Sequence, residues 1–229
     1  MRELWICNVG TVEYRAAVEL QERLRARVIA GDLPDLLLLL EHPAVYTLGR
    51  RSDAGDLPFG EDHWRAQGID VVRTQRGGKL TYHGPGQLVG YPIMRTTDVV
   101  AFLRTMERAI AAALAEEGIS ARGRDHEGPA YTGVWVEDRK IASIGVHLSK
   151  GVTAHGFAVN VDNDVAPFHQ VTACGLPDVR MTSIALETGR AGGLDCFRKR
   201  VAYAYAQAHG MRQRIVAPAR LEAPIPSVA

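Results

Sequence analysis

Hydrophobic and polar residues recur along this chain with two periods, one typical of strands and one typical of helices. The uninterrupted apolar run Leu36–Leu40 lies between two prolines and predicts a buried strand. Further strand-like runs over residues 132–136, 140–148 and 152–161 are separated by turn-forming residues and predict a meander of three strands.

Helical periodicity marks three further segments. Apolar residues at helical spacing predict a helix over residues 14–28, and a second is expected over residues 194–209. Between them, Asp98 is the expected cap of a long Ala-rich helix that runs to Glu117 and is stopped by Gly118. Because strands cluster in neighbouring runs with helices between the clusters, the predicted fold class is α+β, with a mixed sheet flanked by helices.

Composition limits the kind of protein without identifying its activity. The 229 residues fit one domain over residues 1–216, with the Pro-containing residues 217–229 as a loosely ordered tail. Because 27 basic residues nearly balance 26 acidic ones, no nucleic-acid partner is expected. The longest strongly apolar run is far shorter than the ~20 residues that span a bilayer, so no membrane partner is expected. Three cysteines without a framework spacing, and no secretory h-region, predict a cytoplasmic location.

One segment is far richer in glycine than its surroundings. It reads Arg76-Gly-Gly-Lys-Leu-Thr-Tyr-His-Gly-Pro-Gly-Gln87 and leads directly into an apolar run. Glycine lets backbone N–H groups approach a ligand closely, which favours a binding loop over a plain turn. Because the loop matches neither the phosphate-cradling nor the dinucleotide pattern, a nucleotide is not the expected ligand.

The three cysteines have different sequence surroundings. Cys7 lies in an apolar strand pattern and Cys196 in an amphipathic helix, so both are expected to be structural. Cys174 lies in a segment with loop character and is followed by Gly175, which leaves a backbone N–H free for an oxyanion. The surroundings of Cys174 allow either a nucleophile or a structural thiol. No His, Cys, Asp or Glu group has ligand spacing, so no metal site is expected.

A nucleophilic thiol requires a base or a cation nearby, and Lys140 is one candidate. Strict alternation along the strand places Lys140 on the face of Ala142, Ile144 and Val146, where apolar neighbours would help its amine exchange protons near neutral pH. Spacing alone favours the alternative, a turn lysine that faces water. Other candidates for the base are His83, His147, His155 and His169, of which His147 and His155 are expected to be ordinary strand residues.

Taken together, four blocks of sequence resemble the octanoyltransferases of lipoate assembly, also called lipoyl(octanoyl) transferases. The blocks are Leu40-Glu-His-Pro-Ala-Val-Tyr-Thr-Leu-Gly-Arg50, residues 76–92, residues 139–146 with residues 155–160, and Cys174-Gly with Thr182-Ser183 downstream. The resemblance implies a fold like the catalytic domain of biotin and lipoate protein ligases. It also implies transfer of an octanoyl group from octanoyl-acyl carrier protein to a specific lysine of lipoyl domains, such as those of 2-oxoacid dehydrogenase E2 subunits and the glycine cleavage H protein.

The resemblance also assigns site residues. It implies that Cys174 accepts the acyl group as a thioester, that Lys140 is its acid and base partner, and that no cofactor is needed. The implied acyl pocket is lined by Arg76, Gly77, Gly78, Lys79, Leu80, Thr81, Tyr82, His83, Ser143, Ile144, Gly145, Gly156, Phe157 and Ala158. Within this set, Arg76 is expected to pin the Gly-rich loop, and His83 to shape the pocket or orient the carbonyl.

Two alternative functions follow from the same residues. An ATP-dependent lipoate or biotin ligase on this fold would form an acyl-adenylate and would not need a nucleophilic cysteine. A protein that only binds lipoyl domains or acyl carrier protein would have no use for the thiol of Cys174. For an acidic carrier protein, Arg50, Arg51 and the pair Arg122 and Arg124 are the candidate contacts.

Overall fold

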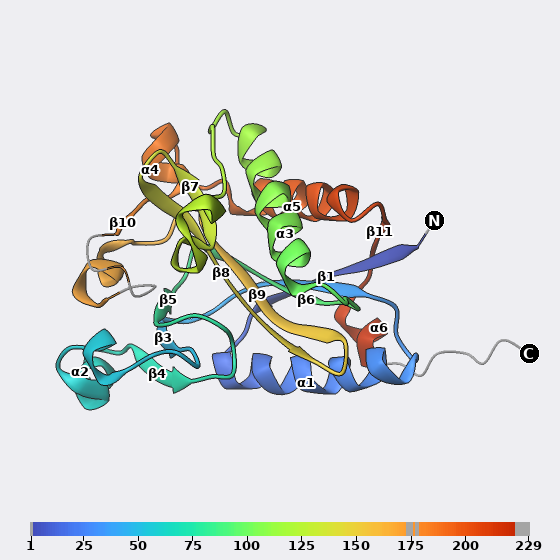
Figure 1. Ribbon diagram of the computed structural model, residues 1–229, viewed down its shortest axis with the longest axis horizontal. Coiled ribbons are helices and arrows are strands. Elements are labelled where there is room, and N and C mark those ends of the chain that lie inside the picture. The colour runs from blue at the N-terminus through green and yellow to red at the C-terminus, as the bar shows by residue number, and fades with distance from the viewer. Residues whose placement is uncertain (1, 173–175, 177–178, 223–229) are drawn as a thin grey trace, which may run out of the picture.

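A computed structural model describes residues 2–172, 176 and 179–222 (Figure 1). In the described part of the chain, eight strands form one mixed sheet in the order β10-β8-β9-β6-β2-β1-β11, with β7 paired to β8. The bounds of these strands are β1 (Glu3–Thr11), β2 (Leu36–Glu41), β6 (Gln87–Ile93), β7 (Gly133–Val136), β8 (Arg139–Ser149), β9 (Val152–Asn160), β10 (Arg180–Met181) and β11 (Arg212–Ile215). Parallel pairs, such as β1 with β2, occur beside antiparallel ones, such as β8 with β9. The predicted α+β class with a mixed sheet is confirmed.

Helices cover both faces of this sheet (Figure 1). Helices α3 (Val99–Ala115) and α5 (Leu194–Ala208) pack on one face, and α1 (Tyr14–Ala30) packs on the other. Side chains of β2 alternate between the two faces of the sheet. Leu37 and Leu39 pack on the α3/α5 side, and Leu36, Leu38 and Leu40 pack on the α1 side. The run is continuously apolar because both of its faces are buried.

The predicted helices are present at nearly the predicted positions. Asp98 caps α3 as expected, since its carboxylate accepts a hydrogen bond from the backbone N–H of Ala101 at 2.9 Å. The three predicted strands of the meander are β7, β8 and β9. The predicted tail from residue 217 begins differently: the short helix α6 (Pro218–Glu222) contacts β1, and Leu221 is buried among the residues of the α1 side.

A second, smaller sheet lies beside the main one (Figure 1). It consists of β3 (Val45–Leu48), β4 (Asp70–Arg73) and β5 (Thr81–His83), and the helix α2 (Gly60–Ala66) packs against it. Its core contains Tyr46, Trp64 and Tyr82, and the ring of Tyr46 contacts the rings of the other two. The Gly-rich segment contains β5 and leads into β6, so it runs from the small sheet to the main one. The short helix α4 (Ile184–Thr188) begins after Ser183, whose side chain caps it.

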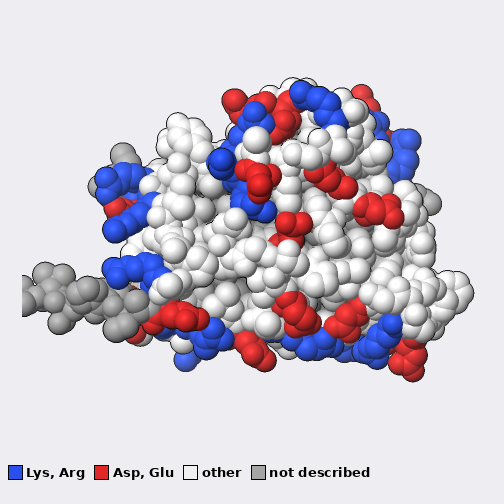
Figure 2. Space-filling model, turned by 180° about the vertical axis from the view of Figure 1, so that it is seen from behind, with Lys and Arg blue, Asp and Glu red and all other residues white. Residues whose placement is uncertain are grey.

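Charged side chains are spread over the surface without a dominant sign. On the face shown in Figure 2, basic and acidic residues lie interspersed around a broad uncharged area. Across residues 2–172, 176 and 179–222, every helix is too short or too polar to traverse a bilayer.

Candidate active site

A cavity of about 280 Å³ opens where the Gly-rich loop meets strands β8 and β9. It brings together Lys140 and all of the predicted pocket residues except Tyr82. Those residues are Arg76, Gly77, Gly78, Lys79, Leu80, Thr81, His83, Ser143, Ile144, Gly145, Gly156, Phe157 and Ala158. Segments that are far apart in the sequence thus form one site. The predicted nucleophile, Cys174, lies outside the described residues.

Tyr82 belongs to the small sheet instead of the cavity. Along β5, Thr81 and His83 line the cavity, whereas Tyr82 points to the opposite side of the strand. Its ring packs against Tyr46 and Phe168 in the core of the small sheet. Period-2 alternation therefore separates Tyr82 from its two neighbours.

A bulge in β8 decides which way Lys140 points. Strand β7 pairs Val134 with Ala142 and Trp135 with Lys140, so Ile141 is an extra residue on β8. Residues directly opposite each other point to the same face, and the consecutive residues Val134 and Trp135 point to opposite faces. Lys140 therefore lies on the face opposite to Ala142. The prediction that strict alternation holds along this strand is wrong, because it overlooked the extra residue.

The side chain of Lys140 is enclosed in the cavity wall. Lys140 is 1% exposed, so the interpretation as a turn lysine that faces water is wrong. Its ammonium lies 5.2 Å from the centroid of the Trp135 ring, and a Cβ on Gly133 would lie 2.6 Å from its Cε atom. Among the described residues, no Asp or Glu forms an ion pair with it. Buried lysines usually have a carboxylate partner, which makes this one unusual.

Strand β10 lies beside Lys140 in the main sheet. Met181 pairs with Lys140 in a parallel register, and the N–H of Thr182 donates a hydrogen bond to the carbonyl of Lys140 at 3.0 Å. Asn160 of β9 in turn donates to the carbonyl of Thr182 at 2.9 Å. The residues just after the Cys174 segment are thereby fixed beside Lys140.

The Gly-rich loop is held on both sides. As expected, Arg76 pins it: its guanidinium donates to the carbonyl of Thr47 at 2.5 Å and to the hydroxyl of Thr47 at 2.8 Å. The N–H of Gly77 donates to the carbonyl of Val146 at 3.0 Å, at the edge of β8. A Cβ on Gly145 would lie 2.7 Å from the carbonyl oxygen of Gly77, so this close approach of two backbones requires glycine.

Lys79 is bound by two carboxylates of the short 3₁₀ turn Ala54–Asp56 and its cap. Its ammonium donates to Asp53 at 2.8 Å and to the buried carboxylate of Asp56 at 3.1 Å. The backbone carbonyl of Asp56 also accepts a hydrogen bond from the N–H of Thr172 at 3.1 Å. The loop is thus connected to the chain just before the Cys174 segment.

His83 lies in a buried group of neutral polar rings. Burial, with a contribution from the nearby His42, holds the pKa of His83 well below its usual range. Its Nδ1 lies 2.8 Å from Oε1 of Gln87, and its ring stacks on Tyr14 at 5.8 Å between centroids. Burial also lowers the pKa of His42 to about 4 and, together with the Arg76 charge, the pKa of His155 to about 3. These rings act as hydrogen-bonding groups without charge.

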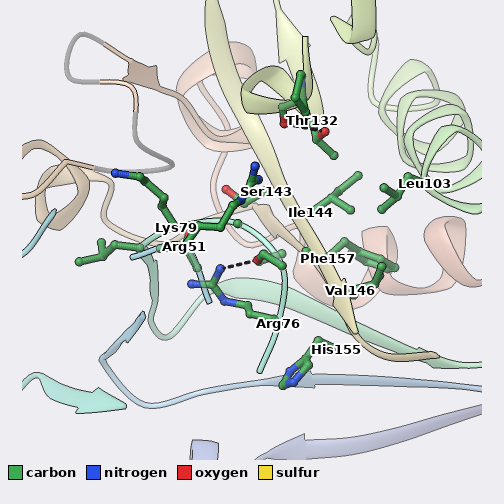
Figure 3. Close-up of a pocket in the computed structure, with 18 of the residues that line it drawn as sticks. Arg51, Arg76, Lys79, Leu103, Thr132, Ser143, Ile144, Val146, His155 and Phe157 are labelled. Atoms are coloured by element: carbon green, nitrogen blue, oxygen red, sulfur yellow. Dashed lines mark hydrogen bonds between the residues drawn. The ribbon is translucent and has the colours of Figure 1, made fainter. Parts of the chain in front are cut away.

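Several cavity residues were not predicted from the sequence. Figure 3 shows Leu103, Thr132 and His155 beside the predicted residues. The remaining unpredicted residues that line the cavity are Tyr14, Arg51, Tyr91, Val99, Pro129, Ala130 and Val146. Arg51 and His155 had been considered only for other roles. The remaining residues come from elements whose position at the cavity depends on long-range packing, so no local sequence signal marked them.

The other predicted residues lie elsewhere or have structural partners. Cys7 is buried, as expected, and its burial raises its thiol pKa to about 11. Cys196 is exposed on α5, so the expectation that it is structural is wrong. Arg124 pairs with Glu127 and stacks on Tyr131 and Trp135, whereas Arg50 and Arg51 are exposed. In the described part of the chain, no group of three or more His, Cys, Asp or Glu side chains could hold a metal ion.

The fold is similar to that of solved lipoate and biotin protein ligases. A lipoate-protein ligase A, solved with bound ATP, superposes with a TM-score of 0.77 at 18% identity, covering 96% of this chain and 91% of that one. The biotin protein ligase of Aquifex aeolicus superposes with a TM-score of 0.51 at 13% identity, covering 91% and 69%. The predicted likeness to the catalytic domain of lipoate and biotin ligases is confirmed at the level of fold.

Sequence comparison narrows the class. Residues 13–206 match the family described as the lipoyl protein ligase A/B catalytic domain. An octanoyltransferase from Rubrobacter xylanophilus is 47% identical over 185 residues, covering 79% of this chain and 82% of the relative. The chain belongs to this family and, within it, to the octanoyltransferases, which are acyltransferases.

Proposed function

We propose that this protein moves an octanoyl group from octanoyl-acyl carrier protein to a specific lysine of lipoyl domains, through a thioester on Cys174. Residues 1–216 would act as one catalytic domain, in the cytoplasm. The proposal rests mainly on Lys140, which is buried, lines the cavity and has no carboxylate partner among the described residues. A cation kept in this state is suited to stabilise a thiolate and to exchange a proton during the reaction.

In the first half-reaction, the Cys174 thiolate attacks the carbonyl carbon of the donor thioester. A new carbon–sulfur bond forms, the donor carbon–sulfur bond breaks, and the carrier thiol leaves with its electron pair and takes up a proton. The donor is already activated, so positioning and stabilisation of the oxyanion are sufficient and ATP is not needed.

In the second half-reaction, the amine of the lipoyl-domain lysine attacks the same carbonyl carbon. The carbon–nitrogen bond forms, the bond to Cys174 breaks so that its sulfur leaves as the thiolate, and the acceptor ammonium loses two protons in all. Lys140, neutral after its ammonium has given a proton to the leaving carrier thiol, takes up one of them, and the other passes to solvent. The fixed flanks of the Cys174 segment support this role: Thr172 is hydrogen-bonded to Asp56, and Met181 pairs with Lys140.

The basic residues at the cavity opening fit an acidic donor. Arg50 and Arg51 follow β3 and are exposed, Arg51 lines the cavity, and neither forms an ion pair among the described residues. We assign the docking of the carrier protein to these two, since Arg124 is occupied by Glu127.

The test is an ATP-free assay that follows the mass of a lipoyl domain incubated with the enzyme and octanoyl-acyl carrier protein. The proposal predicts an octanoylated lipoyl domain with the wild type, none with Cys174→Ala, and transfer slowed by about 100-fold or more with Lys140→Met. Cys196→Ala, which removes an exposed thiol away from the cavity, serves as the matched control and should transfer normally. Transfer that appears only with free octanoate and ATP would instead indicate a ligase.

A further inference from the structure

The cavity has a direction, which the register of β8 and β9 defines. Lys140 lies near the start of β8, and Val146, six residues later, pairs with His155 of β9. Ser143 and Gly145 line the cavity between these ends. If the reaction takes place at Lys140, as proposed above, the acyl chain runs along Ser143 and Gly145 toward His155. In Figure 3, Ser143 lies between Thr132 at one end and His155 at the other.

The ring of His155 lies on the opposite face of the sheet from the one that alternation predicts. Phe157 and Val159 of β9 pack on the α3/α5 side, whereas Val152 and Ala158 pack on the α1 side. Two residues before Phe157, His155 should therefore point to the α3/α5 side. Its φ of +58° departs from a regular strand, and its ring lies 6.3 Å from that of Tyr91, on the α1 side.

This backbone conformation is unfavourable for a residue with a side chain, so its neighbours must maintain it. One of them is Gln21 of α1, whose Oε1 accepts a hydrogen bond from the N–H of His155 at 2.7 Å. The result is a ring that is turned into the cavity wall and is only 4% exposed. Local strain of this kind, next to a candidate site, is typical of a functional constraint.

The ring of His155 has hydroxyl groups beside it, and the charge of Arg76 lies nearby. Its Nε2 lies 3.4 Å from the hydroxyl of Thr74, which also accepts a hydrogen bond from Tyr14 at 3.3 Å. The Nδ1 atom of His155 is buried and has no hydrogen-bond partner among the described residues. This end of the cavity therefore differs from the small, smooth wall that Gly145, Gly156 and Ala158 provide.

We propose that His155 closes the acyl-binding cavity and is a specificity-determining residue that limits the length of the transferred chain. An octanoyl chain ends before this wall. A longer chain would have to displace the ring, and its methylene groups would cover a polar nitrogen without offering a hydrogen bond. Size and polarity thus act in the same direction, against longer chains.

The test compares transfer from hexanoyl, octanoyl, decanoyl and dodecanoyl carrier-protein thioesters. His155→Gly removes the ring, suits a positive φ and keeps the N–H that binds Gln21. The expected result is a rise of roughly tenfold or more in the rates with decanoyl and dodecanoyl groups relative to octanoyl, as for a pocket opened by a few methylenes. The matched control is Lys150→Gly, which relieves a φ of +49° in the turn of the same hairpin and should leave the profile unchanged.

His155→Asn provides a second variant, since Asn tolerates the left-handed conformation and is shorter than His. It should extend the accepted chain to decanoyl. Folded variants that keep the wild-type preference for octanoyl would overturn the assignment of His155 while leaving the proposed function intact. Absence of transfer by the wild type from every thioester would overturn both.

Discussion

Lys140 lies directly opposite Trp135 across the β7–β8 ladder, with its ammonium 5.2 Å from the centroid of the indole ring. The bulge at Ile141 produces this pairing and turns the lysine toward the Gly-rich loop. The aromatic face stabilises the cation without neutralising it, as a carboxylate would. The lysine thus stays available for a thiolate or for an incoming amine.

This arrangement predicts that Lys140→Met separates activity from stability. Lys140 has no carboxylate partner among the described residues, so its removal leaves none of them with a buried, unpaired negative charge. The free energy of unfolding should therefore stay within about 1 kcal/mol of the wild type. The rate of transfer should fall by about 100-fold or more, as for loss of an acid–base group. Urea unfolding and a transfer assay on the same preparation measure both quantities.

Lys79→Met is the matched comparison for this variant. Its ammonium neutralises Asp53 and the buried Asp56, so its loss should lower the free energy of unfolding. A Lys140→Met variant that is as unstable as Lys79→Met would show that Lys140 is structural.

A second prediction concerns the close contact between Gly145 and the Gly-rich loop. In Gly145→Ala, the new Cβ would meet the carbonyl oxygen of Gly77 at 2.7 Å, so the loop must move. Displacement of a binding loop by a fraction of an ångström or more should reduce kcat/KM by about 10- to 100-fold. Steady-state kinetics with the octanoyl donor provide the measurement.

The control for this substitution is Gly193→Ala, at a position with open space around a Cβ and an ordinary φ of −87°. Its kcat/KM should match the wild type. Equal losses in the two alanine variants would argue against a role for the loop contact.

Much of the fold could be predicted because its signals are local. The spacing of apolar residues marked α1, α3 and α5, and the run Leu36–Leu40 marked a strand buried on both faces. The side-chain directions that shape the cavity depend on long-range pairing. No glycine or turn residue marks the position of the bulge at Ile141 in the sequence, and nothing in the sequence indicates a positive φ at His155.

The same distinction applies to the site residues. The Gly-rich loop was recognisable from composition, and the resemblance to octanoyltransferases supplied most of the other lining residues. Tyr14 and Tyr91 reach the cavity through helix and strand packing, which one sequence does not reveal. Tyr82 shows the converse: it lies inside the motif, yet strand alternation turns it into the core of the small sheet.

The buried histidines predict how stability changes with pH. In the folded protein the pKa is about 4 for His42 and about 3 for His155, against roughly 6.5 for an unfolded histidine. Below about pH 6.5 the unfolded chain binds more protons than the folded one, so the free energy of unfolding falls as pH falls. The stabilisation that comes from the two neutral rings is complete near neutral pH. Each of the two histidines should lower the free energy of unfolding by about 2 kcal/mol between about pH 7 and about pH 5.

Urea unfolding at these two pH values provides the measurement. His42→Gln should weaken the pH dependence by the contribution of one histidine. A free energy of unfolding that is constant or rises toward acid would contradict the assignment of neutral, buried rings.

The most direct test of the central claim is the intact mass of the enzyme after a single exposure to octanoyl-acyl carrier protein without ATP. The Cys196→Ala background removes the exposed thiol on α5, so that an adduct there cannot confuse the result. The acyl-enzyme mechanism predicts one octanoyl group on the enzyme, its absence when Cys174→Ala is added, and its loss when a lipoyl domain is supplied. An adduct that persists in the double variant, or transfer to the lipoyl domain without any adduct in that variant, would contradict the acyl-enzyme mechanism.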